Sequence, residues 1–162
     1  MKPSIESVLR FINLTTSGLL AGSLGFGGAP LVPGWKEELP RERMRVLEAL
    51  KSLDYFNAIG PVALGSAVTL AVAGSRSTRF HRALDTAAAV SLAGVLAATV
   101  MGTVPINRRL DATAATDYAS DDSQLLARTW SRAHAVRTTL GLSAFFLAVA
   151  SNLAPRTSRA GA

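Results

Sequence analysis

The sequence predicts an all-α membrane protein: a four-transmembrane-helix bundle with a short amphipathic helix between helices 1 and 2. Of the 162 residues, 49% are hydrophobic, and the mean hydropathy of the chain is positive. Charged residues are spaced so that four long uncharged runs of 25, 21, 22 and 18 residues remain. These runs lie between Arg10 and Lys36, Asp54 and Arg76, Asp85 and Arg108, and Arg137 and Arg156. A helix of about 20 apolar residues spans a bilayer, so each run is a candidate span.

We expect a single integral membrane domain over 1–162, with helices at about 8–32, 55–74, 84–105 and 123–153. A soluble helical bundle is the alternative. It is disfavoured because one face of a helix in such a bundle normally meets water and carries charge within 21 or 22 residues.

The first predicted helix has a face of small residues. Ser17, Ala21, Gly25 and Ala29 recur every four residues, a spacing that lets transmembrane backbones approach closely. This face suits packing within the chain or against a second copy, so a homo-oligomer through this helix is one expected partner. The glycines around Phe26 do not form a phosphate-binding loop, because no strand precedes them and no Lys-Ser/Thr pair follows.

The segments around the second predicted helix contain fewer residues that indicate structure or function. After Pro40, apolar residues recur every third position, which predicts the amphipathic helix at the membrane surface. Pro61 is expected to bend the second helix and to leave backbone groups that need partners, and Asn57 could supply one. A packing hydrogen bond is the first interpretation of Asn57, and substrate contact is the second. His81, among arginines in a tight turn, is expected to face solvent or lipid headgroups.

Charge and cysteine content exclude several functional classes. The net charge is +6, but the basic residues are scattered among segment ends, which is typical of membrane flanks and not of a nucleic-acid interface. The absence of cysteine excludes thiolate metal sites, disulfides and a cysteine nucleophile. Lysine and arginine are denser on the side that holds both termini, which favours a multi-pass cell-membrane protein with cytoplasmic termini.

The candidate site lies where the third and fourth predicted helices meet. Trp130, His134, Arg137 and Gly141 share one helical face, and Asn107 ends the preceding helix at the same membrane level. Burying an arginine near hydrocarbon costs about a few kcal/mol unless it is paired or lines a wet cavity, so Arg137 is a functional candidate. The competing interpretation is that Arg137 extends to the headgroups while Trp130 anchors the interface.

His134 is the only side chain in this group that exchanges a proton near neutral pH. A structural hydrogen bond is the alternative role. No two-histidine metal site is expected, because His81 and His134 are predicted on opposite sides of the membrane, although His134 with aspartates is left open.

The pattern VPINRRL at 104–110, followed by an acidic loop and W-x-x-x-H-x-x-R, resembles the anthrone oxygenase family of small four-helix membrane proteins. The resemblance covers about 45 residues of segments three and four. It implies an oxygenase that converts aromatic polyketide anthrones to anthraquinones with O2 and without a dedicated cofactor. Asn107, Trp130 and Arg137 match recurring positions of the family, whereas the position of His134 varies among its members.

These residues suit the chemistry that the resemblance implies. His134 could remove a substrate proton, Arg137 with Asn107 could stabilise the resulting enolate oxygen, and Trp130 could stack on a planar ring. Gly141, Asn57 and Phe26 are further candidate substrate contacts. The alternative function is a non-enzymatic membrane protein that binds a hydrophobic small molecule or a partner helix. A transporter is a third possibility, disfavoured by the lack of internal repeats.

Overall fold

The computed structural model describes residues 4–28, 52–74, 78–113 and 121–155. These ranges contain helices and no strands, which confirms the all-α prediction for this part of the chain. The elements are α1 (Ile5–Gly28), α4 (Ser52–Ala73), α5 (Arg79–Ala98), the π-helical segment η1 (Thr99–Thr103), α6 (Val104–Thr113) and α7 (Asp121–Leu153).

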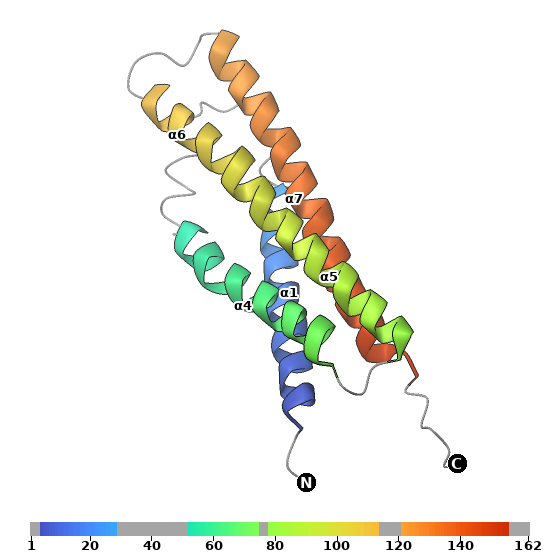
Figure 1. The fold of residues 1–162 in the computed structure, drawn as a ribbon. Coiled ribbons are helices and arrows are strands. Elements are labelled where there is room, and N and C mark those ends of the chain that lie inside the picture. Colours follow the sequence, from blue (N-terminus) through green and yellow to red (C-terminus); the bar gives the residue numbers. More distant parts are fainter. Residues whose placement is uncertain (1–3, 29–51, 75–77, 114–120, 156–162) are drawn as a thin grey trace, which may run out of the picture.

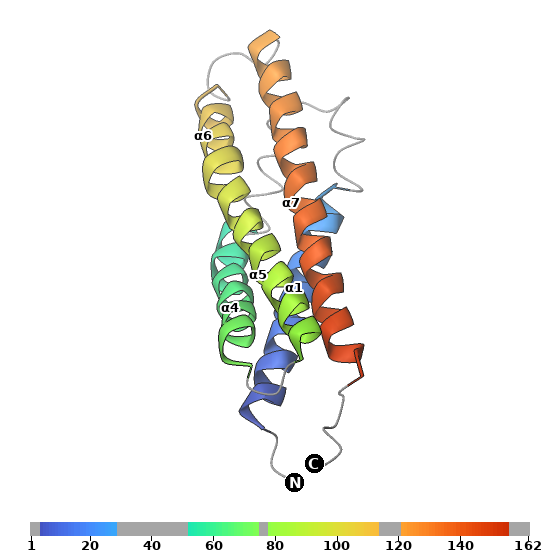
Figure 2. The ribbon, with the colours of Figure 1, turned by 45° about the vertical axis from the view of Figure 1, so that its right-hand side comes forward.

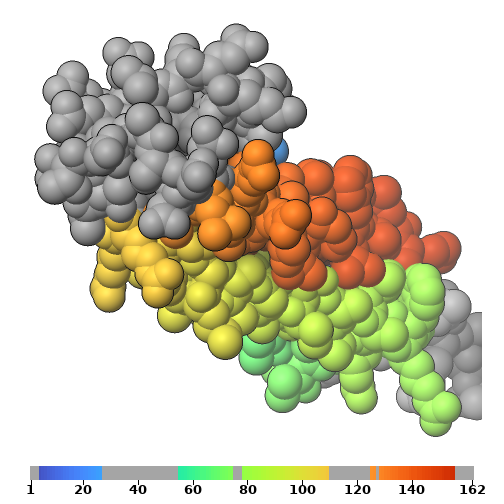
Figure 3. Space-filling model, turned by 90° about the horizontal axis from the view of Figure 1, so that it is seen from above, coloured from blue at the N-terminus to red at the C-terminus, as the bar shows by residue number. Residues whose placement is uncertain are grey.

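The four long helices pack around a shared interior. α1 contacts α4 and α7, and α5 contacts the same two helices, so α1 and α5 lie diagonally opposite each other (Figure 1). Viewed from above, α5 and α6 lie between α7 and α4 (Figure 3). The start of α1 and the end of α7 lie at one end of the molecule, and α6 with the first part of α7 extends past α1 and α4 at the other (Figures 1 and 2).

Among the described residues, three helices are long and apolar enough to cross a membrane: Tyr55–Ala73, Arg79–Arg109 and Arg128–Leu153. These helices indicate that the chain is a membrane protein. α1 is not among these three helices, so a fourth membrane span stays a prediction. The amphipathic helix expected after Pro40 lies outside the described residues.

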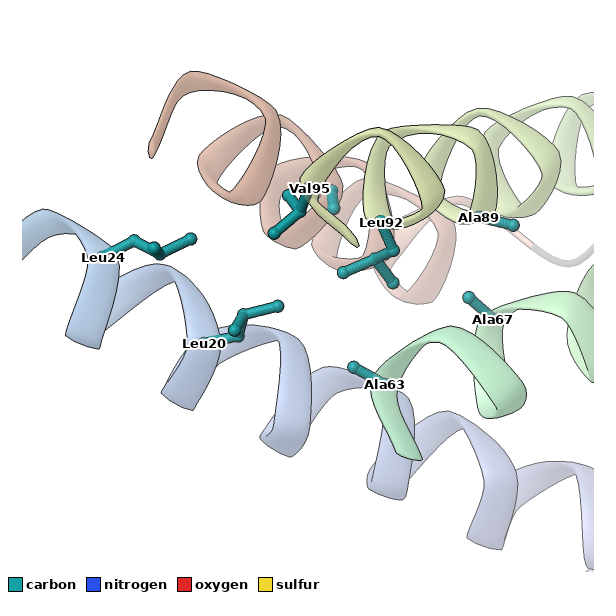
Figure 4. Close-up of a cluster of buried hydrophobic side chains, with 8 residues drawn as sticks. Leu20, Leu24, Ala63, Ala67, Ala89, Leu92 and Val95 are labelled. Carbon is teal, nitrogen blue, oxygen red and sulfur yellow. The ribbon is translucent and has the colours of Figure 1, made fainter. Parts of the chain in front are cut away.

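A layer of small and branched apolar side chains fills the middle of the molecule (Figure 4). Its buried members are Leu20, Leu24, Ala63, Ala67, Ala89, Leu92, Val95 and Ala144. The alanines let the helix backbones come close, so the layer is dense without large side chains. It separates a polar cluster at the end with the termini from a second polar cluster at the other end.

The third membrane helix continues past Pro105, so the prediction that it ends at 105 is wrong. It runs on through η1 and α6 to Thr113. The N–H of Val104 bonds to the carbonyl of Thr99, five residues back, which is the π-helical pattern. Proline lacks an N–H and its ring crowds the carbonyl four residues earlier. The wider π turn tolerates both the missing N–H and the crowded carbonyl, so the helix continues past Pro105.

α5 begins at Arg79, about a turn earlier than expected. Thr78 caps it, with its side-chain oxygen accepting from the backbone N–H of His81. The extra turn puts His81 and Asp85, four residues apart, on the same buried face. His81 is 6% exposed, so the prediction that it faces solvent or headgroups is wrong.

The buried polar cluster near the termini is centred on an ion pair between Arg10 of α1 and Asp85 of α5. The Nη2 of Arg10 lies 3.2 Å from Asp85 Oδ2, and its Nε lies 3.0 Å from Glu6 Oε1. Ser151 of α7 donates to Asp85 Oδ1 at 2.6 Å and accepts from Arg10 Nη1 at 3.1 Å. We call Glu6, Arg10, Asp85 and Ser151 the Arg10–Asp85 cluster. It ties α1, α5 and α7 together.

Candidate functional site

The second buried polar cluster lies on α7, toward the end away from the termini. Trp130, His134 and Arg137 follow one another at intervals of four and three residues, and each is only 5–6% exposed. Thr103 of η1 and Asn107 of α6 complete the cluster by hydrogen bonds to them. We call these five residues the α7 site.

Trp130 is held between two partners. Its indole ring stacks on the imidazole of His134, with centroids 4.8 Å apart and planes 6° from parallel. Its Nε1–H donates to Asn107 Oδ1 at 2.9 Å, which joins α7 to α6. A buried tryptophan needs such an acceptor, because its N–H would otherwise lose its hydrogen bond to water. The stack and the bond together fix the plane of both rings.

Arg137 is a buried cation without a carboxylate partner among the described residues. Its Nη1 donates to Thr103 Oγ1 at 3.0 Å, and its guanidinium carbon lies 5.4 Å from the centroid of the Phe56 ring. Its Nε is buried and has no hydrogen-bond partner in the part of the chain that the structure describes. The side chain stays inside the helix packing and does not extend to the headgroups.

His134 points one ring nitrogen at α1. Its Nε2 lies 3.1 Å from the backbone carbonyl oxygen of Leu24, which also accepts from Thr138 Oγ1 at 3.4 Å. The other nitrogen, Nδ1, is buried and has no hydrogen-bond partner within the described ranges. Within the described residues, the α7 site therefore holds two buried nitrogens without a hydrogen-bond partner, Nδ1 of His134 and Nε of Arg137.

Three other predicted contacts lie apart from this cluster or serve packing. Phe26 is 67% exposed on α1, and Asn57 is exposed on α4. Gly141 packs against α1, because a Cβ built on it would lie 2.8 Å from Leu24 Cδ1. The substrate-binding roles of these residues, like the catalytic roles of Asn107, His134 and Arg137, stay predictions.

Thr103 belongs to the α7 site, and Phe56 and the carbonyl of Leu24 contact it, but none of the three was expected from the sequence. Pro105 could have indicated that Thr103 belongs to the site. A proline that does not end a helix distorts the turn before it, and π turns are frequent at functional sites. Phe56 is one of several aromatic residues in an apolar span. A backbone carbonyl has no sequence signature at all.

The metal-binding prediction stays open. Among the described residues, no three His, Cys, Asp or Glu side chains come together as a metal site would require. The residues of the α7 site are imidazole, guanidinium, amide, hydroxyl and indole groups, of which only imidazole is a common metal ligand.

The fold and the site define a helical membrane protein with a buried, positively charged aromatic site. The chain belongs to the anthrone oxygenase family, whose model matches residues 53–147, more than half of the chain. The match spans the α7 site and leaves α1 outside. No curated protein and no solved structure matches the chain significantly.

Proposed function

We propose that the chain is a membrane-embedded, cofactor-independent oxygenase that acts with O2 on a hydrophobic aromatic, anthrone-like polyketide. One observation carries the proposal: two buried nitrogens of different chemistry, neither with a hydrogen-bond partner among the described residues, belong to side chains three residues apart on one helix face. Buried polar atoms are normally hydrogen-bonded, so unpaired ones suit a ligand that completes them. A neutral imidazole nitrogen can take a proton, and a guanidinium N–H can donate to an oxyanion.

The reaction needs a base and an oxyanion partner. An anthrone carries a CH2 group opposite a ring carbonyl, and His134 would remove one of its protons. The carbonyl oxygen then becomes an enolate oxygen, which Arg137 would stabilise as a hydrogen-bond donor with full charge. The enolate passes one electron to O2, and the two radicals combine at that carbon as a peroxide anion. Protonated His134 would return its proton to give the hydroperoxide, and loss of water leaves the quinone. Anthrone and O2 thus give anthraquinone and water, with all electrons supplied by the substrate.

The remaining members of the site would orient the substrate. Trp130, whose ring orientation is fixed by His134, would stack on a planar ring of the substrate. Asn107 holds Trp130 through its oxygen and keeps an amide N–H group for the enolate. We assign the exposed Phe26 and Asn57 to the substrate's entry surface, and Gly141 to the close approach of α1.

We also propose that α1 is the fourth membrane span and that the termini are cytoplasmic. Its 24 residues reach about 36 Å, more than the roughly 30 Å of hydrocarbon. Several of its polar residues point inward, since Arg10, Asn13 and Ser17 are buried. The outward face is apolar, with exposed Ile5, Val8, Phe11, Leu19 and Phe26.

Oxygen consumption tests the proposed reaction. Purified protein in lipid nanodiscs should consume O2 with an anthrone and release the quinone. His134→Gln and Arg137→Met should each lower kcat by about 100-fold or more. Arg132→Met is the matched control, because Arg132 is an exposed cation on the same helix and should leave kcat unchanged. Folded His134 and Arg137 variants with wild-type rates would contradict the assignment.

A non-enzymatic binding protein is the second candidate. A groove of about 540 Å³ on the outer side of α7, lined by Leu142, Phe146 and Leu147 with two hydroxyl side chains, suits an apolar chain. Gly22 and Gly25 leave open space on α1, where a Cβ would meet nothing within 4 Å. A hydrophobic ligand that co-purifies without turnover, or a partner lost with Gly25→Leu, would favour this candidate over the oxygenase.

A further inference from the structure

The carbonyl of Leu24 sets the hydrogen position on His134. A carbonyl oxygen can only accept, so the nitrogen 3.1 Å from it, Nε2, must carry the hydrogen. A neutral imidazole has a single N–H, which leaves a lone pair on Nδ1. The opposite tautomer would place two lone pairs against each other at Nε2 and leave a buried Nδ1–H without an acceptor among the described residues.

The position of this carbonyl is itself fixed by packing. The side chain of Leu24 is fully buried, and it fills the space that Gly141 leaves on α7. Thr138 donates to the same carbonyl at 3.4 Å, so α7 contacts it at two points. The imidazole plane is fixed separately by Trp130. His134 therefore has one defined tautomer and one defined ring orientation.

We propose that α1 is a positioning element of the α7 site, in which the Leu24 carbonyl holds His134 as the Nε2–H tautomer and makes Nδ1 the proton acceptor. Leu24 is thus a positioning residue that acts through its backbone. Its helix lies outside the matched segment 53–147, so α1 completes a site whose side chains belong to that segment. The role of Nδ1 as a base rests on the proposed function, whereas the tautomer does not.

Nitrogen NMR tests the tautomer directly. The chain has only two histidines, so protein labelled with ¹⁵N-histidine gives two imidazole spin systems, and His81→Asn assigns them. In folded wild-type protein above neutral pH, we expect His134 to show a protonated Nε2 and an unprotonated Nδ1. A protonated Nδ1, or rapid averaging between the two tautomers, would overturn the proposal.

Two glycine variants test the role of α1. Gly141→Val should push α1 away from α7, because even a Cβ there would lie 2.8 Å from Leu24. Gly94→Val is the matched control: its Cβ would lie 3.0 Å from Leu140 Cδ1, at the contact between α5 and α7. Only Gly141→Val should abolish the single tautomer of His134, and it should lower kcat by about 100-fold. If both variants lost the single tautomer equally, the cause would be a general loosening of the helix packing, and this result would contradict the proposal.

The NMR test of the tautomer and the kinetic test of the oxygenase function can fail independently. If His134 is the Nε2–H tautomer but no anthrone drives O2 consumption, the positioning by α1 stands and the proposed oxygenase function fails. If the protein consumes O2 while His134 is the Nδ1–H tautomer, the oxygenase stands and the positioning role of Leu24 fails.

Discussion

Two buried arginines at opposite ends of the same molecule have very different interaction partners. Arg10 meets two carboxylates and a hydroxyl group, which accept from its Nε, Nη1 and Nη2 atoms. Arg137 meets one hydroxyl and one aromatic ring, and its Nε has no partner among the described residues. The first is a neutralised pair whose polar atoms are satisfied, whereas the second is a charge without a counter-ion in that part of the chain.

In our proposal, this difference separates a cluster that stabilises the fold from a site that binds a ligand. An uncompensated buried charge costs several kcal/mol, so a sequence keeps one where its charge is used. A buried pair that is already saturated has no capacity left for a substrate. The comparison therefore supports a stabilising role for the Arg10–Asp85 cluster and the chemical role that we propose for the α7 site.

The largest predicted effect concerns the structural cluster. Arg10→Met leaves Asp85 buried without its cation, so the free energy of unfolding in detergent should fall by about 3–5 kcal/mol. The double variant Arg10→Met with Asp85→Leu removes both charges and should recover most of this loss. Chemical unfolding of the two variants beside wild type measures both effects. An Arg10→Met protein as stable as wild type would show that the pair does not stabilise the fold.

The corresponding change at the α7 site should act on activity instead. Arg137→Met removes a charge that has no carboxylate partner in the described structure, so we expect a protein at least as stable as wild type. Its kcat should fall by about 10²–10³-fold, the usual cost of removing one oxyanion donor. Unfolding and O2 consumption are measured on the same preparation. A large loss of stability would mean that Arg137 is bound as firmly as Arg10, and the comparison would fail.

A smaller effect is expected at Thr103. Thr103→Val keeps the shape of the side chain but removes the acceptor of Arg137 Nη1, which should cost about 1–3 kcal/mol of unfolding free energy. Ser91→Ala is a suitable control, because the Ser91 hydroxyl donates to the carbonyl of Ala87 in its own helix α5. If both variants lose the same stability, the bond from Arg137 to Thr103 adds nothing specific.

The smallest effect should come from Trp130→Phe. The change keeps an aromatic ring over His134 but removes the N–H that donates to Asn107, at a cost of about 1 kcal/mol. Because Asn107 then no longer fixes the ring, we expect a higher KM with a modest change in kcat. Steady-state kinetics with an anthrone separate the two parameters, and an unchanged KM would argue against stacking of the substrate on Trp130.

The helical spans and the face of the α7 site were accessible from the sequence because both depend on local spacing. Long uncharged runs predicted the helices now described as α4, α5 and α7, since length and apolarity alone decide whether a helix can span hydrocarbon. The intervals between Trp130, His134 and Arg137 placed them on one face through the helical repeat. The loop connection placed Asn107 near Trp130, where it lies.

Only the tertiary structure decided which buried polar atoms are paired. The bond from Arg10 to Asp85 joins residues 75 apart, and the contact from His134 to Leu24 joins residues 110 apart. Helical periodicity fixes the direction of a side chain but not the neighbour that it meets, which depends on how alanine and glycine faces pack. A backbone carbonyl is present at every residue, so its use by His134 follows from that packing alone.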